Sequence, residues 1–358
     1  MLIWAEGFDH YGTGATGNGG RDYMLSGAWA AFSWANGTAP IISSTQARTG
    51  SYALRIAYNS LATGGVQARR VLGAAQIVVG CGFGVYFNTL PDINKEHGIE
   101  FRNNANNCIA EFTVQSDGAI GCYVGSTRTL IASSDPVISA SSWQHIECKI
   151  VCDTVVGEIE VRVNGNVVLH LTDQNLGSLG ATQIVFGMPD QDSGSSITYY
   201  FDDIVTWNDL GDDNNDFLGP QRVYTFFADA DTAVADWLVN GAADGYAAID
   251  DSPPDADTSY IIGVLEGEKS EFELPDLPPE TALIAGVFVP IMGRLEDAGT
   301  GEVTVSLISE GLADAGDPIT LTTAYTYWGT VFERDPNTDA PWTRAALEAA
   351  LVRLEKTG

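Results

Sequence analysis

The chain has 358 residues, of which 47 are acidic and 17 are lysine or arginine, and its formal net charge at pH 7 is −30. This balance excludes functions that need a cationic surface, so we expect binding neither to nucleic acid nor to an anionic membrane. Its 45% hydrophobic residues and 39 glycines predict folded cores connected by many turns, and its length favours two domains.

The sequence predicts a protein that is made and folded in a cytoplasm, without a signal peptide or a membrane-spanning helix. Residues 1–12 read MLIWAEGFDHYG, which lacks the basic segment and apolar stretch of a signal peptide. No apolar run reaches the length required for membrane insertion as a helix. Farther on, Gly12, Gly14 and Gly17 match the spacing G-x-G-x-x-G. Because no amphipathic helix follows, we interpret this passage as a surface loop rather than a dinucleotide site.

Short alternating segments then predict a series of β-strands. A turn at Thr49–Gly50 leads into a strand that places Leu54 and Ile56 on one face. Further strands are expected at 78–87, 98–101, 108–114 and 120–124. In the third of these, Cys108 is expected to point inward. Short strands separated by turn residues favour a β-sandwich and exclude a βαβ architecture.

Residues 142–171, SWQHIECKIVCDTVVGEIEVRVNGNVVLHL, predict three antiparallel strands. Apolar and polar residues alternate at 146–152 and again at 159–163, so each strand has one apolar face. Asn164–Gly165 between two β-prone runs is the strongest short signal for a hairpin. Such a one-sided sheet must be buried against a second sheet, which predicts a β-sandwich.

The same stretch resembles the laminin-G-like domains that have the concanavalin A jelly roll. The resemblance rests on Trp143 and His145, followed by the run 161–165, VRVNG. It implies a jelly-roll domain over residues 1–208, whose last strand is expected at 196–207. Lectins, glycan hydrolases and structural proteins all use this fold, so the resemblance predicts a fold rather than a function.

A second resemblance, to carbohydrate-binding jelly rolls, implies a structural calcium ion. It rests on three segments, 6–9 (EGFD), 50–56 (GSYALRI) and 201–204 (FDDI). The implied Ca²⁺ ligands are Glu6, Asp9 and Asp202, with Asp203 as the alternative to Asp202. The competing interpretation needs no metal: Asp202 or Asp203 would hydrogen-bond the amino-terminal segment or pair with Arg55.

The sequence shows no hydrolase motif, and we therefore expect a protein without enzymatic activity. Jelly-roll glycanases carry two glutamates flanking an aspartate on one strand, and this pattern is absent. Glu158 and Glu160 are interpreted as a solvated strand face, and His145 as a surface residue beside Trp143. The four histidines (10, 97, 145, 170) have no metal-ligand spacing, and the five cysteines (81, 108, 122, 148, 152) are expected to be reduced.

Residues 209–220 are acidic and rich in turn formers, and they predict a linker before a second, smaller β-rich domain at 221–358. Alternation at 302–309 is the best strand signal of this domain. After Pro341 and Trp342, the recurrence of Leu347, Leu351 and Leu354 predicts a short carboxy-terminal helix. The leucines are expected either to contact a neighbouring subunit or to complete the core of their own domain.

The second half resembles carboxy-terminal domains of virion proteins from tailed bacteriophages. The resemblance rests on the order of the segments 227–237, 252–261, 271–278 and 332–347, and on a pattern of the form E-x-D-P-x-T-x-x-x-W-T. The residues at its fixed positions are Glu333, Asp335, Pro336, Thr338, Trp342 and Thr343. It implies a role in a virus particle and no particular chemistry.

Together these observations predict a non-enzymatic surface component of a tailed-phage virion, either a tail fibre or a capsid decoration. It would be located in the virion, form a homo-oligomer and contact other virion proteins, with a host-surface glycan as a candidate ligand of the jelly roll. The alternative function is a free carbohydrate-binding lectin, or a glycan-active enzyme, on the same fold.

Overall fold

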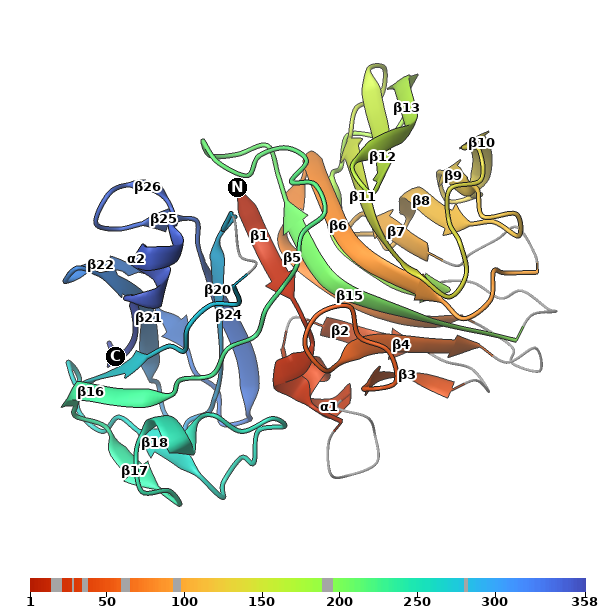
Figure 1. Ribbon diagram of the computed structural model, residues 1–358. Coiled ribbons are helices and arrows are strands. Elements are labelled where there is room, and N and C mark those ends of the chain that lie inside the picture. The colour runs from red at the N-terminus through yellow and green to blue at the C-terminus, as the bar shows by residue number, and fades with distance from the viewer. Residues whose placement is uncertain are drawn as a thin grey trace. The chain divides into compact units, whose positions relative to one another are not determined.

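The computed structural model describes residues 1–13, 21–27, 29–33, 38–58, 65–92, 98–188, 196–279 and 283–358. The chain forms two compact units, one comprising Met1 and Ile3–Tyr224 and the other Leu2 and Thr225–Gly358 (Figure 1). Both are built almost entirely of antiparallel strands, which confirms the predicted all-β class. Gly14, Gly17 and His97 lie outside the described residues. Within those residues, no helix has the length and apolar character needed to cross a bilayer.

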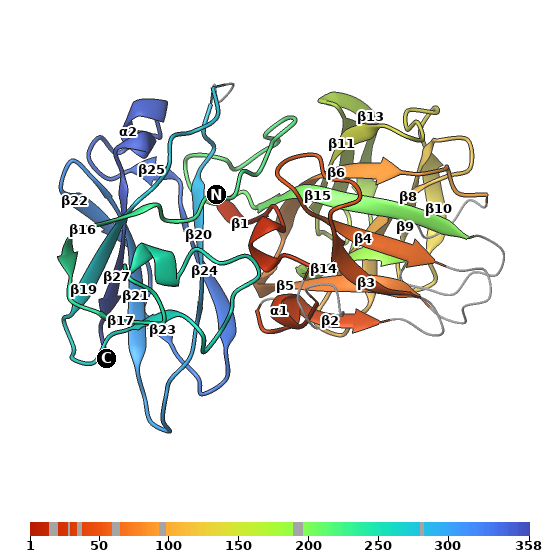
Figure 2. The same cartoon turned by 60° about the horizontal axis from the view of Figure 1, so that its bottom comes forward.

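The first unit is a jelly-roll sandwich of two sheets (Figure 2). Sheet A runs in the order β13-β12-β11-β6-β15-β4-β3, and β1 also pairs with β15. Its strands are β1 (Leu2–Glu6), β3 (Thr38–Ser43), β4 (Ala53–Tyr58), β6 (Val78–Phe87), β11 (Trp143–Val151), β12 (Gly157–Val163), β13 (Asn166–Gln174) and β15 (Ile197–Trp207).

Sheet B runs in the order β10-β9-β8-β7-β14-β5-β2. Its strands are β2 (Trp29–Ser33), β5 (Val66–Gln76), β7 (Gly98–Arg102), β8 (Cys108–Val114), β9 (Ile120–Val124), β10 (Thr129–Ser133) and β14 (Ala181–Met188). The short helices η1 (Asp9–Tyr11) and α1 (Arg21–Leu25) connect β1 to β2. Phe186 of sheet B contacts Phe83 and Phe201 of sheet A, with ring centroids 6.2 and 5.4 Å apart, so aromatic packing joins the two layers.

The predicted hairpin at Asn164–Gly165 is confirmed, and it explains the laminin-G-like pattern. Both residues have a positive φ (49° and 82°), as a tight two-residue turn between β12 and β13 requires. The Asn164 side chain accepts a hydrogen bond from the backbone N–H of His145 (3.0 Å), and the Asn164 N–H donates to the His145 carbonyl (2.7 Å). The turn therefore fixes the start of β11 through the residues that carry the resemblance.

Cysteine placement differs from the sequence prediction at one position. All five cysteines are free and buried, and Cys81 and Cys148 face each other across β6 and β11 in the core. A bulge in β8 pairs Cys108 with Arg102, while Ala110 pairs with Phe101. The extra residue turns Cys108 toward the outer face, where burial and the charges of nearby carboxylates raise its pKa. The predicted inward orientation of Cys108 is wrong for this reason.

The segment predicted as a linker, 209–220, belongs to the first unit, which continues to Tyr224. It packs on the outer face of sheet A, where Glu147 accepts hydrogen bonds from the N–H groups of Leu218 (2.9 Å) and Gly219 (3.0 Å). The Arg162 guanidinium lies 3.7 Å from the centroid of the Phe217 ring. This part of the outer face is therefore covered by the protein's own chain.

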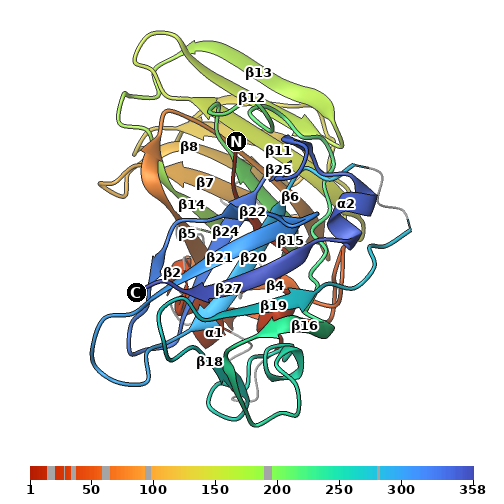
Figure 3. The ribbon, with the colours of Figure 1, turned by 90° about the vertical axis from the view of Figure 1, so that its left-hand side faces the viewer.

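The second unit centres on one antiparallel sheet, in the order β16-β19-β27-β21-β22, with β23 also paired to β21 (Figure 3). These strands are β16 (Ala230–Ala235), β19 (Lys269–Glu273), β21 (Glu302–Ser309), β22 (Leu312–Ala315), β23 (Ile319–Thr320) and β27 (Leu351–Lys356). Three two-stranded ribbons complete the strands: β17 (Leu238–Asn240) with β18 (Tyr260–Ile262), β20 (Val287–Gly293) with β24 (Thr326–Phe332), and β25 (Arg334–Asp335) with β26 (Ala340–Pro341). The helices are η2 (Tyr246–Ala248) and α2 (Arg344–Glu348).

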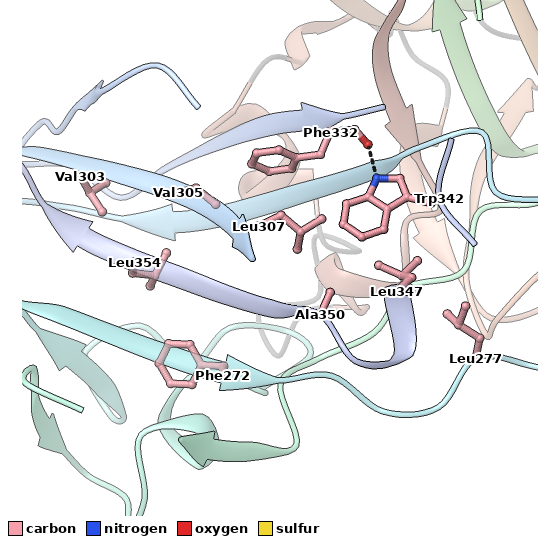
Figure 4. Close-up of a cluster of buried hydrophobic side chains, with 10 residues drawn as sticks. All are labelled: Phe272, Leu277, Val303, Val305, Leu307, Phe332, Trp342, Leu347, Ala350 and Leu354. Carbon is pink, nitrogen blue, oxygen red and sulfur yellow. Dashed lines mark hydrogen bonds between the residues drawn. The ribbon is translucent and has the colours of Figure 1, made fainter. Parts of the chain in front are cut away.

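The predicted carboxy-terminal helix exists, but it is shorter than the leucine spacing suggested. Helix α2 ends at Glu348, and the chain then forms β27, which is hydrogen-bonded to β19 on one side and β21 on the other. Leu347 from α2 and Leu354 from β27 enter the same core, drawn in Figure 4. Leu347 and Leu354 therefore complete the core of their own unit, which was the second of the two expectations, whereas Leu351 is half-buried and lies outside that cluster.

The phage-like pattern around residues 333–343 serves local structure. Asp335 starts the β25–β26 hairpin and accepts hydrogen bonds from the Asn337 N–H (3.0 Å) and the Thr338 hydroxyl (2.9 Å). The Trp342 indole donates to the Phe332 carbonyl (3.2 Å, Figure 4), and the Thr343 side chain caps α2 by accepting from the Ala346 N–H. These residues hold a hairpin and a helix start together.

Candidate functional site

Sheet B carries a polar outer face, which we call the sheet B face. Cross-strand partners share a face, so the register groups its residues: Val185 of β14 lies opposite both Arg69 and Glu100, and Glu100 lies opposite Glu111. The side chains used below are Gln67 and Arg69 of β5, Glu100 and Arg102 of β7, Glu111 and Thr113 of β8, Tyr123 of β9 and Gln183 of β14.

An ion-pair network occupies the centre of the sheet B face. Glu100 accepts from the Arg102 guanidinium (2.7 Å) and from Arg128, in the turn after β9 (3.1 Å). The Arg128 Nε lies 3.0 Å from a Glu111 oxygen. Burial lowers the pKa of Arg128, but the charges of Glu100 and Glu111 outweigh it and leave the pKa raised. Arg128 therefore keeps its charge over the whole physiological range.

These polar side chains are buried, although they lie on the outward side of a sheet. The exposed fraction is 1% for Glu100, 2% for Glu111, 1% for Thr113 and 7% for Arg102. Several of the buried polar atoms have no hydrogen-bond partner within the described part of the chain. They include Thr113 Oγ1 together with the amide oxygens of Gln67 and Gln183. Such atoms are normally paired with protein, water or a ligand.

A row with few side chains runs beside the charged network. Neighbouring positions across β14, β7, β8 and β9 are Gly187, Gly98, Thr113 and Gly121. Three of these four residues are glycines, so the backbone at those positions carries no side chain of its own. The amide of Gln115 lies over the last of them, 2.5 Å from where a Cβ of residue 121 would be. An elongated ligand lying across the strands would thus meet backbone, one hydroxyl and one amide.

The predicted calcium ligands lie elsewhere, at the amino-terminal end of the first unit. Glu6 is buried and accepts from the Phe8 N–H (3.0 Å), the Tyr11 hydroxyl (3.0 Å) and the Trp29 indole (3.3 Å). Asp9 accepts from the N–H groups of Ser51 (2.6 Å) and Tyr52 (3.2 Å). The positive φ of Gly50 and its missing Cβ permit this approach, because a Cβ would lie 2.1 Å from an Asp9 oxygen.

Asp202 and Asp203 bind donors of the segment before β4. Asp202 accepts from the backbone N–H groups of Arg48 (2.7 Å) and Thr49 (3.1 Å). Asp203 accepts from the Arg48 guanidinium (2.6 Å), the Thr49 hydroxyl (2.9 Å) and the Val223 N–H (2.8 Å). The ion-pair partner is therefore Arg48 rather than Arg55, which the metal-free interpretation had named.

The four predicted ligands do not form a metal-binding group as placed. Among the described residues, the one set of three whose ligand atoms all lie within 4.8 Å is Glu158, Glu160 and His170. Calcium requires six to eight oxygens, and the carboxylates of Asp202 and Asp203 already accept several donors each. This geometry does not fit the ion, and the calcium site stays a prediction from the sequence.

Calcium binding can be tested by thermal unfolding. If the sequence-based prediction holds, the melting temperature rises with the logarithm of free Ca²⁺, because the ion binds the folded state alone. Asp9→Asn and Asp202→Asn variants should then lose the increase, while Asp117→Asn, in a turn of sheet B, should keep it. Equal melting temperatures in excess chelator and in millimolar Ca²⁺ would remove the site.

The same carboxylates predict a pH-dependent stability. Burial and the adjacent Asp203 charge raise the pKa of Asp202 to about 8, and burial raises the pKa of Asp9 to about 6. Both folded-state values exceed the value of 3.8 for an unperturbed aspartate. The folded state therefore binds more protons, and its stability should fall as pH rises from about 4 to about 8, by up to ~1.4 kcal/mol per pH unit for each proton.

Urea unfolding of the full chain at pH 5 and pH 8 measures this slope. An Asp202→Asn variant, which cannot ionise, should be less pH-dependent than the wild type, and Asp117→Asn should match the wild type. A wild-type stability that increases between pH 5 and pH 8 would show that other groups dominate.

Two further sequence interpretations concern the outer face of sheet A. Glu158 and Glu160 were expected on a solvated face, and the structure pairs them with His170 (2.9 Å) and Arg162 (2.6 Å). His145 was expected at the surface, but it is 1% exposed, and burial lowers its pKa to about 3. The surface interpretation of His145 is wrong because the chain after β15 covers this face.

The residues of the sheet B face were not among the site residues expected from the sequence. The sequence does contain polar residues two positions apart, and therefore on the same side of a strand, in three of these strands. The pairs are Gln67 and Arg69, Glu100 and Arg102, and Glu111 and Thr113. In single strands such polar positions look like an ordinary solvent-facing side. Only the pairing of β5, β14, β7 and β8 brings them together.

No family model and no curated protein matches the chain. The chain is similar to several solved structures over about half of its length. An endo-β-1,4-glucuronan lyase from Trichoderma reesei is 11% identical and matches 50% of this chain and 90% of its own (TM-score 0.40). The alginate lyase Aly36B is 12% identical, covering 56% and 95% (TM-score 0.39). Domain 4 of AbnA, an arabinanase from Geobacillus stearothermophilus in complex with arabinotriose, is 14% identical, covering 57% and 91% (TM-score 0.39).

These comparisons correct one prediction. The chain was expected not to be an enzyme, and polysaccharide lyases are among the proteins of similar structure, which contradicts that expectation. The expectation rested on a missing pair of glycosidase carboxylates. A lyase cleaves by elimination, which requires a positioned base and not that pair, so the missing pattern excluded too much.

Proposed function

We propose that the first unit binds a glycan on the sheet B face. The observation that carries the proposal is the set of buried, unpartnered polar atoms on the outward side of a sheet: Thr113 Oγ1, Gln67 Oε1 and Gln183 Oε1. A buried polar group without a partner costs about 1–3 kcal/mol. A ligand that supplies hydrogen-bond donors to these atoms would recover that free energy.

A sugar chain has the chemistry that this face requires. Its hydroxyl groups both donate and accept, so they can pair with an amide oxygen and with a threonine hydroxyl. In the row through Gly98 and Gly187 these two residues carry no side chain, so a polymer there would contact backbone. Four strands at a spacing of about 4.8 Å span roughly 14 Å, which suits an oligosaccharide better than a single sugar. Tyr123, in the next row, offers an aromatic ring for a sugar to contact.

We place the glycan on sheet B rather than on sheet A because the outer faces of the two sheets differ. Part of the outer face of sheet A, around Glu147 and Arg162, is covered by residues of its own unit, including Phe217 and Leu218. Sheet B holds the buried network and the unpartnered atoms. Most of its polar groups lie on strands, with Arg128 in the turn after β9, so the site is preorganised for a ligand.

Binding can be tested by calorimetric titration of the full chain with neutral and acidic oligosaccharides. We expect Gln183→Ala or Thr113→Val to weaken binding about three- to tenfold, the equivalent of one hydrogen bond. Gln174→Ala, the same change on strand β13 of sheet A, should leave the affinity unchanged. Binding that is equal in all three variants would place the ligand elsewhere. Chromatography of the titrated glycan shows whether it is also cleaved.

The place of the protein in a virus particle stays a prediction, as do its homo-oligomeric state and its contacts with other virion proteins. The phage-like pattern of the second unit supports it, and the residues of that pattern have the structural roles described above. Mass spectrometry of washed particles would test it, and absence of the chain from them would exclude it.

A further inference from the structure

We infer that the glycan bound on the sheet B face carries carboxylate groups, and that Arg69 and Arg102 bind one of them. This inference rests on the proposed function and names the class of its ligand, an acidic, uronate-containing polysaccharide. The evidence is the charge of the face, the unpaired donors of the two guanidiniums and the single neutral acceptor that they share.

The sheet B face has a cationic excess in a strongly acidic chain. Three guanidiniums (Arg69, Arg102, Arg128) face two carboxylates (Glu100, Glu111), which leaves one positive charge, whereas the whole chain has a net charge of −30. Both carboxylates are bound to Arg128, and Glu100 is also bound to Arg102. Arg69 has no carboxylate partner within the described residues, so the excess lies at this residue.

Arg69 and Arg102 converge on one neutral oxygen. The Arg69 Nη1 lies 3.4 Å and the Arg102 Nη1 lies 3.2 Å from the side-chain oxygen of Asn106. These distances are long for hydrogen bonds from a guanidinium, which are about 2.7–2.9 Å to a carboxylate. The Nε groups of both arginines are buried and have no hydrogen-bond partner in the described part of the chain. The two guanidiniums therefore retain donors for another acceptor.

Asn106 is held in place by its turn and is exposed at the surface. Its N–H donates to the Asn103 carbonyl (2.9 Å), and its φ of 61° lies in the left-handed region that asparagine tolerates. Its amide oxygen thus marks a point between two guanidiniums, on a residue that is exposed. A carboxylate there would accept two charge-assisted hydrogen bonds where the amide accepts two long ones.

The substitution Asn106→Asp tests the inference, because it places a carboxylate of the protein at this point. Full-chain protein would be titrated with an oligomer of a uronic acid, with the same oligomer after methyl esterification, and with a neutral oligosaccharide. We expect the wild type to bind the acid at least tenfold more tightly than its ester. Asn106→Asp should abolish this preference and raise the melting temperature, since it pairs the two arginines internally.

Asn104→Asp adds the same charge two residues away and should preserve the preference. Arg69→Gln should reduce acid binding at least tenfold, while Arg55→Gln, on sheet A, should not. If the wild type binds acid, ester and neutral sugar equally, and Asn106→Asp changes none of them, the inference is wrong and glycan binding stands. If none of the three glycans binds, the proposed function is wrong as well.

Discussion

Replacing Trp342 by alanine is expected to destabilise the second unit by about 3–5 kcal/mol, the range for truncating a buried tryptophan. Trp342 is 4% exposed and packs in the core with Leu307 and Leu347 (Figure 4). Its loss leaves a cavity and removes the donor to the Phe332 carbonyl. For a unit of this size the melting temperature should fall by roughly 10–20 °C.

Hydrogen exchange of the full chain, read by mass spectrometry, measures this effect in each unit separately. Exchange in β21 and β27 should accelerate in Trp342→Ala, whereas β6 and β11 should keep the wild-type rates. Trp342→Phe keeps part of the aromatic packing while losing the indole donor and some buried volume, so it should cost less than the alanine substitution. Unchanged protection of β27 in the alanine variant would contradict the packing described here.

Replacing Arg48 by methionine is expected to destabilise the first unit by about 3–5 kcal/mol at neutral or alkaline pH, because it leaves a buried charge without its partner. The side chains of Arg48 and Asp203 are 9% and 0% exposed, and their atoms approach to 2.6 Å. The same guanidinium donates to the Gln221 carbonyl, so the end of the first unit should loosen too.

The cost should shrink in acid, since burial raises the pKa of Asp203 and a protonated carboxyl no longer requires a cation. Denaturation with urea at pH 5 and pH 8 measures the difference. The double variant Arg48→Met, Asp203→Asn should be more stable than Arg48→Met alone at pH 8. Arg55→Met is the control for loss of a charge on the neighbouring strand. A cost independent of pH would show that packing of the Arg48 side chain, and not its charge, stabilises this region.

Local sequence patterns were sufficient to predict that the first unit is a β-sandwich. Alternation at 146–152 and 159–163 specified which side of each strand is apolar, and Asn164–Gly165 specified the turn between β12 and β13. Both signals depend on neighbours within a few residues, which is why the sequence alone contains them. The free, buried cysteines also follow from the local pattern at all positions except Cys108, whose orientation depends on a bulge against β7.

Features that depend on contacts between residues distant in the chain could be assigned only from the tertiary structure. Leu351–Lys356 has leucine spacing that fits a helix, yet it is a strand because β19 and β21 offer hydrogen bonds on both sides. His145 is buried because the chain after β15 returns over sheet A. The sheet B face also depends on contacts between distant residues. Arg69 and Arg102 are 33 residues apart in the sequence. Only the pairing of β5, β14 and β7 brings their guanidiniums to one oxygen of Asn106. Strand order and register, which no local pattern encodes, thus create the candidate site.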